Sequence, residues 1–376
     1  SGRVGGDGVM AKLGEVCLLK AGKFVSANDI SPEYNKGLYP CFGGNGIRGY
    51  VADYTHDGEF PLIGRQGALC GNVNLAFGKF HATEHAVVVQ PKIEMNVHWL
   101  YYALNAMNLG QYATGAAQPG LAVSKLETLS IEIPNISEQN KIAQTLYKVE
   151  QLVNFRKQQL AKLDELVKAR FVEMFGDAKL NPNNLPCCSL SEYIVFLTSG
   201  SRGWSQYFTD SGEYFITIKN VKNCKITLQD VQCVTPPDNA EAKRTRVQEN
   251  DLLISITADL GRTGIVTKEI AEHGAYINQH LTCIRLKQDK LNPLYVAYYM
   301  ESDAGKEQFI AKNQSAVKAG LNFNAINSLK LMVPPLSLQN EFAAFVERVD
   351  QQKQTVQQSL EKLELMKKAL MQEYFG

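Results

Sequence analysis

The feature that most constrains this chain is a segment that is written twice. Residues 134–152 read PNISEQNKIAQTLYKVEQL, and residues 334–352 read PPLSLQNEFAAFVERVDQQ. Aligned without gaps at an offset of 200, residues 121–176 and 321–376 share 18 identical positions out of 56. Solenoid repeats have a shorter period of about 20–50 residues. The repeat therefore indicates duplication of a whole domain.

Both copies are predicted to form one long helix. Ser137 is a candidate N-cap, the chain from Asn140 to Phe175 consists of helix formers, and Gly176 supplies the C′ residue. Apolar residues recur every seven positions in each copy, so each helix needs a partner that buries its stripe. The predicted positions of this coiled-coil spacer are Ile142, Leu146, Val149, Val153, Leu160, Leu163, Val167, Phe342, Val346, Val349, Val356, Leu360, Leu363 and Leu370.

An antiparallel coiled coil between the two helices is the simplest way to bury both stripes. At a rise of 1.5 Å per residue, residues 137–175 would span roughly 58 Å, with one globular block at each end. The alternative is that both are ordinary core helices of two tandem domains. Their length favours the spacer, because globular helices usually run about 8–20 residues.

Short β-type runs and turn signals fill the remaining sequence, as in FPLIG, VNLAF and HAVVVQP. The predicted fold class is therefore α+β: two β-rich globular domains separated by two long helices in an antiparallel coiled coil, with a pseudo-twofold internal repeat. The expected boundaries are 1–11 for a cloning remnant or disordered start, 12–133 for the first β-rich domain, 134–176 for the first helical region, 177–333 for the second β-rich domain and 334–376 for the second helical region.

Composition excludes several classes of protein. The sequence holds 39 Lys and Arg against 38 Asp and Glu, which is not the strongly basic balance of a free-standing nucleic-acid binder. No apolar run approaches the about 20 residues of a membrane span. The 8 cysteines show no C-x-x-C pair, so neither a disulfide framework nor a zinc site is expected. We expect a cytoplasmic protein with reduced thiols and no bound metal.

Three strings mimic catalytic motifs but lack the right context. Residues 44–49 fit G-x-G-x-x-G, yet a β-like stretch follows where a dinucleotide site needs a helix, so a tight loop is predicted. Residues 81–85 fit the reversed H-x-x-E-H string, yet a strand is expected there, on which the two histidines lie too far apart for one metal ion. The acidic residues and lysine of 237–243 are too close together for a nuclease triad. Without a nucleophile, base and orienting group, the chain is interpreted as a binder.

Each β-rich block concentrates side-chain types that suit the reading of DNA, although many of them are equally expected as turn formers or solvated surface residues. Arginine pairs with guanine, and Asn or Gln with adenine, while Lys, Ser and Thr suit phosphates. The candidates in the first block are Tyr39, Gly44, Asn45, Arg48, Arg65, Gln66, Asn72, Asn74, Lys79, His81, Thr83 and His85. The candidates in the second block are Ser199, Ser201, Arg202, Trp204, Lys219, Asn220, Lys243, Arg244, Arg246, Thr257, Arg262, Asn278, Gln279, His280 and Lys318.

These strings together resemble the DNA sequence-specificity (S) subunit of type I restriction-modification systems. The resemblance covers residues 12–376 and is carried by YPCFGGNGIRGYV, IGRQGALCGNV, KFHATEHAVVV, TSGSRGWSQYF, GEYFITIKNV, KRTRVQENDLLISITADLGRTGIV, GAYINQHLTCIRL and AVKAGLNFNAINSL, closed twice by P-x-x-S-x-Q-N. The second helix departs from the usual pattern, because Leu338 stands where the first has Glu138.

The resemblance implies a non-catalytic adaptor. Its two target-recognition domains would each read one half of a split, asymmetric site in double-stranded DNA, with modules about 34 Å apart. The helices would set the gap and hold two modification (methyltransferase) subunits and, in the full complex, restriction (motor-nuclease) subunits. S-adenosylmethionine and ATP would bind those partners, and no membrane is involved. The alternatives are a scaffold without sequence preference, an inhibitor of such a complex, and a metal-dependent nuclease.

Overall fold

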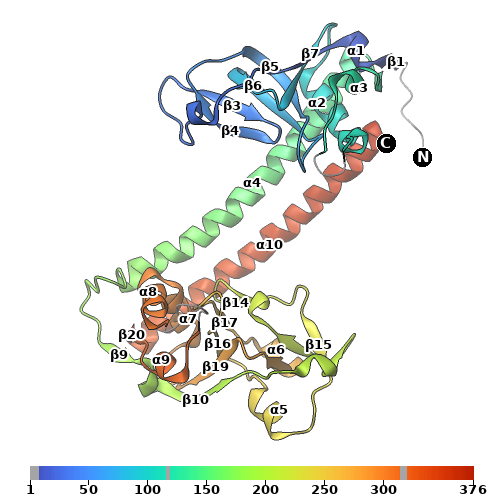
Figure 1. Cartoon of the computed structure of the whole chain (residues 1–376). Helices are drawn as coiled ribbons and strands as arrows, with labels where there is room; N and C mark the ends of the chain where they lie inside the picture. The colour runs from blue at the N-terminus through green and yellow to red at the C-terminus, as the bar shows by residue number, and fades with distance from the viewer. Residues whose placement is uncertain (1–7, 116–118, 314–319) are drawn as a thin grey trace. The chain divides into compact units, whose positions relative to one another are not determined.

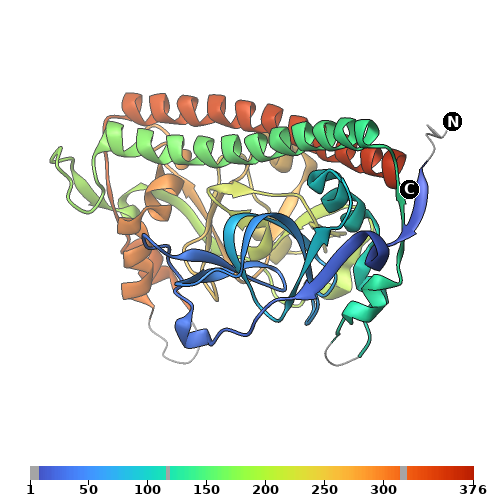
Figure 2. The ribbon, with the colours of Figure 1, turned by 90° about the horizontal axis from the view of Figure 1, so that it is seen from above.

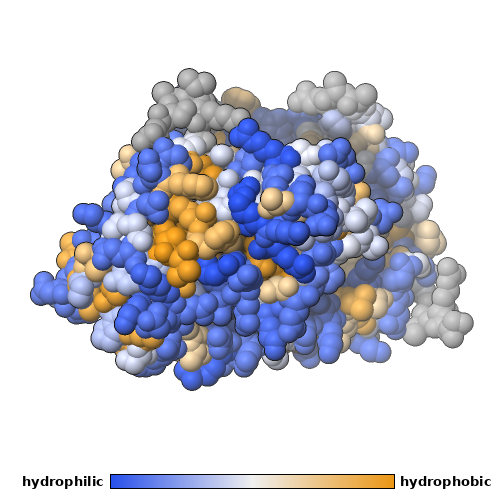
Figure 3. Space-filling view, turned by 90° about the horizontal axis from the view of Figure 1, so that it is seen from below, coloured by the Kyte–Doolittle hydropathy of each residue, from blue (hydrophilic) through white to orange (hydrophobic). Residues whose placement is uncertain are grey.

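The computed structural model describes residues 8–115, 119–313 and 320–376 (Figure 1). The fold is α+β, as predicted, with two β-rich parts and two long helices that pack together, α4 (Ile136–Phe175) and α10 (Leu336–Phe375). No helix among the described residues is both long and apolar enough to cross a lipid bilayer. The face of the molecule drawn in Figure 3 is mostly hydrophilic, with apolar side chains gathered in limited patches.

The chain divides into two compact units. The first comprises residues 1–158 and 356–376, and the second comprises residues 159–355. Both long helices cross the boundary, so α4 begins in the first unit and ends in the second, whereas α10 does the reverse. Each unit therefore contains one β-rich part, the start of one long helix and the end of the other.

The first unit is built on a six-stranded sheet with strand order β2-β7-β5-β6-β3-β4 and a two-stranded ribbon, β1-β8. Its elements before α4 are β1 (Val9–Lys12), α1 (Leu13–Val16), β2 (Cys17–Ala21), η1 (Ala27–Asp29), β3 (Tyr39–Gly43), β4 (Gly46–Val51), β5 (His56–Gly64), β6 (Val73–Ala82), β7 (Ala86–Pro91), α2 (Val97–Ala106), η2 (Leu109–Tyr112), α3 (Val123–Glu127) and β8 (Ser130–Ile133). The strands predicted for FPLIG, VNLAF and HAVVVQP are confirmed. Residues 9–11, assigned above to a disordered start, instead pair with β8 as part of β1.

The second unit has four-stranded sheets ordered β10-β19-β16-β17 and β11-β15-β12-β18, and two-stranded ribbons β13-β14 and β20-β9. Its elements between the long helices are β9 (Cys187–Ser189), η3 (Leu190–Tyr193), β10 (Ile194–Ser199), η4 (Trp204–Tyr207), β11 (Phe208–Thr209), β12 (Glu213–Ile216), η5 (Ile218–Asn220), β13 (Val221–Lys222), β14 (Lys225–Ile226), β15 (Gln232–Val234), α5 (Ala240–Thr245), β16 (Leu252–Ser255), β17 (Thr263–Ile265), α6 (Lys268–His273), β18 (Ala275–Ile277), β19 (Leu281–Leu286), α7 (Pro293–Glu301), α8 (Asp303–Lys312), α9 (Phe323–Asn327) and β20 (Lys330–Met332).

The two units repeat one topology beyond the helices. The order β2-β7-β5-β6 returns as β10-β19-β16-β17, and the ribbon β1-β8 returns as β9-β20. The parallel pairing of β3 with the end of β6 returns as β12 with β18. Even the hydrogen bonds that close the ribbons correspond, from Leu13 N to Leu129 O (2.8 Å) and from Leu190 N to Leu329 O (2.7 Å). The duplication therefore includes the β-rich parts.

Helix α4 begins at Ile136, one residue before its predicted N-cap, Ser137. Asn135, rather than Ser137, caps α4, because the Glu138 N–H donates to Asn135 Oδ1 (2.9 Å) while Ser137 already lies inside the helix. At the other end, Gly176 has a φ of +81° and its N–H donates to Val172 O (2.8 Å). The C′ role of Gly176 is confirmed, since this left-handed conformation favours glycine.

Within each unit, the segments of α4 and α10 run antiparallel (Figures 1 and 2). In the first unit, Lys157 Nζ lies 2.9 Å from Glu364 Oε1, and earlier on α4 Glu150 Oε1 lies 2.6 Å from Lys367 Nζ, which comes later on α10. In the second unit, Arg170 pairs with Glu341 (2.9 Å). Partners that advance on one helix retreat on the other, which is the antiparallel pairing predicted.

Most positions of the predicted seam are buried, including Val153 and Val356 near the middle of the helices, and the starts of the two helices also join the cores of the units. Ile142 and Leu146 join the core of the first unit with Trp99 of α2, and Phe342 and Val346 join that of the second. Those starts thus pack on their own β-rich part as well as beside the other helix. The fully buried spacer positions are Ile142, Leu146, Val149, Val153, Val167, Phe342, Val346, Val349, Val356 and Leu360, and the partly buried ones are Leu160, Leu163, Leu363 and Leu370.

The repeated Gln-Asn pair explains why the start of the helix is written twice. Gln139 Oε1 accepts from the Asn96 N–H (2.8 Å), and its Nε2 donates to Pro134 O (2.8 Å). Asn140 Oδ1 accepts from Asn96 Nδ2 (2.7 Å), while Asn96 Oδ1 caps α2 through the Trp99 N–H (2.9 Å). The pair therefore ties the start of a short helix to the start of the long one.

The second unit repeats this clamp around Gln339. Its Oε1 accepts from the Asn292 N–H (2.9 Å), its Nε2 donates to Pro334 O (2.8 Å), and Asn292 Nδ2 donates to Asn340 Oδ1 (2.9 Å). Gln139 is 2% and Gln339 0% exposed. These amides satisfy backbone groups that burial would otherwise leave without a partner.

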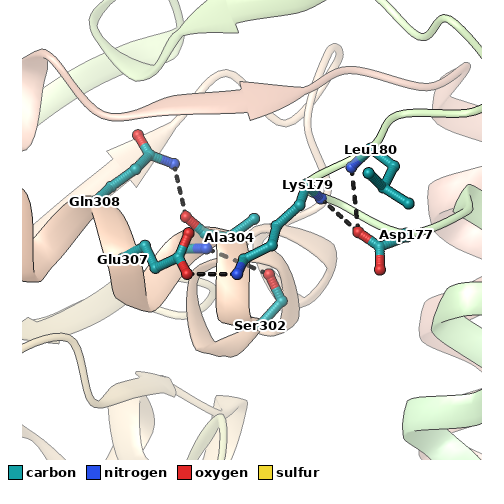
Figure 4. A network of polar contacts seen from close by, with 8 residues as sticks. Asp177, Lys179, Leu180, Ser302, Ala304, Glu307 and Gln308 are labelled. Atoms are coloured by element: carbon teal, nitrogen blue, oxygen red, sulfur yellow. Dashed lines mark hydrogen bonds and ion pairs between the residues drawn. The ribbon is translucent and has the colours of Figure 1, made fainter.

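The segment that follows α4 is held against the second unit. Asp177 Oδ1 accepts from the Lys179 N–H (2.8 Å) and the Leu180 N–H (3.2 Å), and the Lys179 ammonium pairs with Glu307 of α8 (Figure 4). On the same helix, Gln308 Nε2 donates to Ala304 O (3.4 Å) and to Lys330 O (2.8 Å). The polar residues that follow α4 thus form a turn that is anchored to a helix.

Candidate nucleic-acid interface

In the first unit, the loop between β5 and β6 is closed by backbone hydrogen bonds. Gly64 N donates to Asn72 O (2.8 Å), and Gly71 N donates back to Gly64 O (2.7 Å). Gly71 has a φ of +92°, and a Cβ there would lie 2.2 Å from Gly110 N. Only glycine fits this position. The ends of the loop, residues 65–72, are therefore fixed.

The short turn between β6 and β7 packs on this loop. The Ala86 N–H donates to Thr83 O (3.0 Å), which closes the turn, and the Arg65 N–H donates to His85 O (3.0 Å). The string H-x-x-E-H is thus not the single strand expected above, nor a helix, because β6 ends at Ala82 and a turn precedes β7. His81 Nε2 instead lies 3.2 Å from Lys23 O.

The hairpin turn between β3 and β4 completes the cluster. A Cβ at Gly64 would lie 1.9 Å from Gly44 O, so two chain segments meet here without side chains between them. Asn72 Nδ2 donates to Asn45 Oδ1 (2.8 Å) across the same gap. The G-x-G-x-x-G string therefore forms a tight hairpin, as predicted. The predicted residues that this corner of the unit brings together are Gly44, Asn45, Arg65, Gln66, Asn72, Asn74, Thr83 and His85.

Charged groups converge beside this corner. Burial raises the pKa of the Cys41 thiol, the Arg48 guanidinium opposes that rise, and the Glu84 carboxylate adds to it. Burial likewise raises the pKa of the Cys70 thiol, which Arg65 opposes. Two arginines and one carboxylate thus act on the two thiols of this corner. The predicted set omits Glu84. The string HATEH contains this carboxylate, but it suggests a zinc motif rather than a residue that contacts DNA.

The second unit builds the same corner from different residues. Ser255 N donates to Arg262 O (2.9 Å), Gly261 N donates to Ser255 O (3.0 Å), and the Ile256 N–H donates to His280 O (3.0 Å). Gly261 has a φ of +80° and faces Phe309 as closely as Gly71 faces Gly110. The loop 256–262 and the turn 278–280 are therefore the counterparts of 65–72 and 83–85.

Hydrogen bonds gather further polar residues here. Thr257 Oγ1 lies 2.6 Å from His280 Nδ1, and the Gln279 N–H donates to Ser201 O (3.0 Å). The Arg262 guanidinium pairs with Asp259 in its own loop. The predicted residues that this corner brings together are Ser199, Ser201, Arg244, Thr257, Arg262, Asn278, Gln279 and His280.

Other predicted residues lie elsewhere or point inward. Three have buried side chains whose first role is packing or internal hydrogen bonding: His81, Trp204 and Asn220. The side chain of Ser201 is buried too, although its backbone belongs to the second corner. Thr83 is also buried, although its backbone belongs to the turn. The exposed cations away from the corners are Lys79 over the Tyr54 ring, Lys243 beside Asp238, Arg246 beside Glu213, Arg202 and Lys219. Tyr39 packs against Tyr54, and Lys318 lies outside the described residues.

The structure gives no support to a metal-dependent nuclease. In the part of the chain that is described, no three His, Cys, Asp or Glu side chains are grouped so that they could hold a metal ion. The acidic string near residue 238 ends in α5, whose start is capped by Asn239, rather than in a strand. The two corners offer hydrogen-bond donors and acceptors instead of a nucleophile with a base.

Comparison with known proteins agrees with this geometry. The model of the family described as "Type I restriction modification DNA specificity domain" matches residues 7–165 and 203–365. The chain belongs to this family. The predicted family resemblance is thus confirmed, and the two matched stretches correspond to the two halves of the duplication.

One curated relative is the type I restriction enzyme EcoprrI specificity subunit from Escherichia coli, which is 52% identical over 149 residues. That alignment spans 39% of this chain and 37% of the relative. A crystal structure of a type I restriction-modification system S subunit from M. genitalium has a TM-score of 0.66 at 17% identity, covering 99% of this chain and 97% of that chain. A structure from a study of complex assembly and conformational transition of the type I R-M system has a TM-score of 0.56 at 16% identity, covering 98% and 97%. The solved structures thus share the fold.

Proposed function

We propose that this protein is the non-catalytic DNA sequence-specificity subunit of a type I restriction-modification complex. Each unit reads one half of a bipartite, asymmetric site in double-stranded DNA through its own corner of loop and turn. The paired helices set the unread gap and dock two modification subunits, to which restriction subunits are added in the full complex. S-adenosylmethionine and ATP bind to these partners, and the protein works in the cytoplasm, where its thiols stay reduced.

One observation carries this proposal. The two corners have matching backbone hydrogen bonds and a close-packed glycine at the matching positions 71 and 261, yet they present different side chains. Two alike frames with unlike polar side chains suit two readings of different base sequences, because base edges are distinguished by donor and acceptor pattern. A scaffold without sequence preference would need no such difference. Near-neutral charge fits a protein that gains phosphate contacts from partner subunits, since affinity for DNA scales with the number of phosphates neutralised.

Methylome sequencing of cells with and without this chain tests the proposal. We expect a bipartite methylated motif that disappears when the chain is deleted. The purified chain alone should bind DNA weakly and gain sequence-specific affinity when modification subunits are added. An unchanged motif in the deletion strain would favour the scaffold or inhibitor instead.

Single substitutions then test whether the two readers are independent. Arg65→Ala should relax the motif in one half-site only, and Arg262→Ala in the other, because a lost base contact costs about 1–3 kcal/mol. Arg348→Ala removes an exposed arginine of α10 outside both corners and should leave both half-sites unchanged. Relaxation of both half-sites by either corner variant would contradict independent readers.

A further inference from the structure

The turns 83–85 and 278–280 are the same structural element. The Ala86 N–H donates to Thr83 O, and the Leu281 N–H donates to Asn278 O, both at 3.0 Å. The first residue of each turn also donates to a neighbouring strand. The Thr83 N–H donates to Phe42 O (2.9 Å), and the Asn278 N–H donates to Ile216 O (3.1 Å). The turns have equal length, so their residues correspond one to one.

The histidine in the last position is common to both turns, and the residue before it differs. The carbonyl oxygen of this histidine accepts a hydrogen bond from the adjoining loop in each unit. The Arg65 N–H donates to His85 O, and the Ile256 N–H donates to His280 O, both at 3.0 Å. Glu84 Oε1 lies 3.1 Å from His85 Nε2. Gln279 Nε2 lies 3.2 Å from His280 Nε2. The same side-chain contact is therefore made by a carboxylate in one unit and by an amide in the other.

Glu84 has unused capacity for a hydrogen bond. Its second oxygen, Oε2, is buried and has no hydrogen-bond partner among the described residues, and the same holds for His85 Nδ1. The side chain as a whole is 34% exposed, so it is neither locked in the core nor fully solvated. Turning this partly exposed side chain outward would therefore break no hydrogen bond of Oε2 and would let that oxygen accept a hydrogen bond from outside the chain.

A carboxylate at a DNA-reading surface has a restricted choice of partner. It is repelled by phosphates and can only accept hydrogen bonds, so the partner must be an amino group on a base edge. Among the pairings in the major groove, Glu accepts from cytosine N4, whereas Gln both donates and accepts and matches adenine N6 and N7. The two turns thus differ in the one property that separates these bases.

Resting on the function proposed above, we infer that Glu84 and Gln279 are equivalent specificity-determining residues, with Glu84 reading a cytosine and Gln279 reading an adenine at the matching position of the two half-sites. The shared histidine orients the side chain before it. Because the backbone frames coincide, the identity of this single residue sets the base without any change in the turn.

The test exchanges the two residues in the assembled complex. Glu84→Gln should replace cytosine by adenine at one position of one half-site, and Gln279→Glu should make the reverse change in the other. Glu84→Ala should lose discrimination at that position by about fivefold or more. Glu59→Gln is the matched control, because Glu59 Oε1 also contacts a histidine, His98 Nε2 (2.7 Å), outside the corner. It should leave the motif unaltered.

Methylome sequencing and oligonucleotide binding give the readout together. A motif unchanged by Glu84→Gln and Glu84→Ala, with wild-type methylation retained, would overturn this inference and leave the proposed function intact. Equal loss of affinity for every base at the position would also overturn it, since that result indicates a structural role. By contrast, a wild-type complex without any bipartite motif would reject the proposed function itself.

Discussion

The two units share a backbone and differ in what they attach to it. Glycines stand at matching points where chain segments touch, as Gly71 and Gly261 do, and a Cβ at either would lie within 2.3 Å of a neighbouring atom. Partly exposed side chains at matching points are unlike, as Glu84 and Gln279 are. The comparison teaches that close approach fixes the frame, while the polar residues placed on it are free to diverge.

The units also differ in how their sheets are built. In the first, β6 continues for 10 residues and pairs with β5 and then β3. In the second, the same path is broken by α6, so that β17 ends one sheet and β18 joins another. The second unit also buries Asp251, which is 0% exposed and paired with Arg285 (2.8 Å). Divergence thus reaches the core as well as the surface.

The largest difference between the two units is expected in the stability lost when the phenylalanine at the end of each long helix is truncated. Phe-Gly occurs there in both copies. Phe175 is 0% exposed, and its ring lies 4.8 Å from Tyr295 and 5.6 Å from Phe342. Phe375 is only partly buried, with its ring 6.4 Å from Trp99. Phe175→Ala should lower the free energy of unfolding of the second unit by about 4 kcal/mol, and Phe375→Ala that of the first by about half as much.

Buried thiols allow each unit to be measured separately. Burial raises the pKa of Cys17, in the first unit, to about 11, and that of Cys283, in the second, well above its usual range. Both thiols should therefore react with a thiol reagent only when their unit opens. Phe175→Ala should speed the labelling of Cys283, and Phe375→Ala that of Cys17. Acceleration of the same thiol by both variants would contradict the assignment of the helix ends to different cores.

A smaller difference in stability loss is expected when the buried glutamine of each clamp, Gln139 or Gln339, is replaced. Gln139→Ala and Gln339→Ala each leave buried backbone groups without a partner, which costs about 2 kcal/mol. The loss should be greater for Gln339, because its Nε2 also donates to Lys290 O (3.3 Å). Chemical denaturation followed by circular dichroism measures both. Gln158→Ala, at an exposed position of α4, is the control and should change stability by less than about 0.5 kcal/mol. Equal losses for all three variants would remove the clamp as an explanation of the repeat.

The smallest effect is expected for the ion pairs that join α4 to α10. Lys157 and Glu364 form an exposed pair, so a double-mutant cycle of Lys157→Glu and Glu364→Lys should give a coupling energy of about 0.5 kcal/mol. The reversed pair in the double variant should recover most of what either single variant loses. The comparison is Asp164 with Lys353, which pair in the second unit. No coupling in either cycle would argue against antiparallel packing in solution.

Sequence alone predicted the two long helices, three strands of the first unit and the family, because these follow from apolar periodicity, β-type runs and recurring motifs. It found the duplication only over the last part of each copy, because the offset drifts. Leu13 matches Leu190, Gly64 matches Ser255, and Leu121 matches Leu321, which are 177, 191 and 200 residues apart. Insertions in the second β-rich part thus hide the repeat from an alignment without gaps.

The errors have the same physical source. Ser137 is predicted as the cap while Asn135 is the cap observed, because either side chain can accept the first free N–H groups and only the path of the preceding chain decides between them. The pair Gln139 and Asn140 was noticed as a repeat without its role, since its partner Asn96 lies 43 residues earlier than Gln139. Glu84 was missed because its importance depends on equivalence with Gln279, which appears only when the two turns are folded.

The paired ribbons β1-β8 and β9-β20 have one more consequence. Each brings the entry and the exit of a β-rich part side by side, through Val9 opposite Ile133 and through Lys330 opposite Ser189. Under the function proposed above, the residues that would recognise DNA are therefore looped out from each ribbon, while the long helices lie outside the loop. In that case a new target sequence would be acquired by exchanging the whole looped-out part, with the long helices left unchanged.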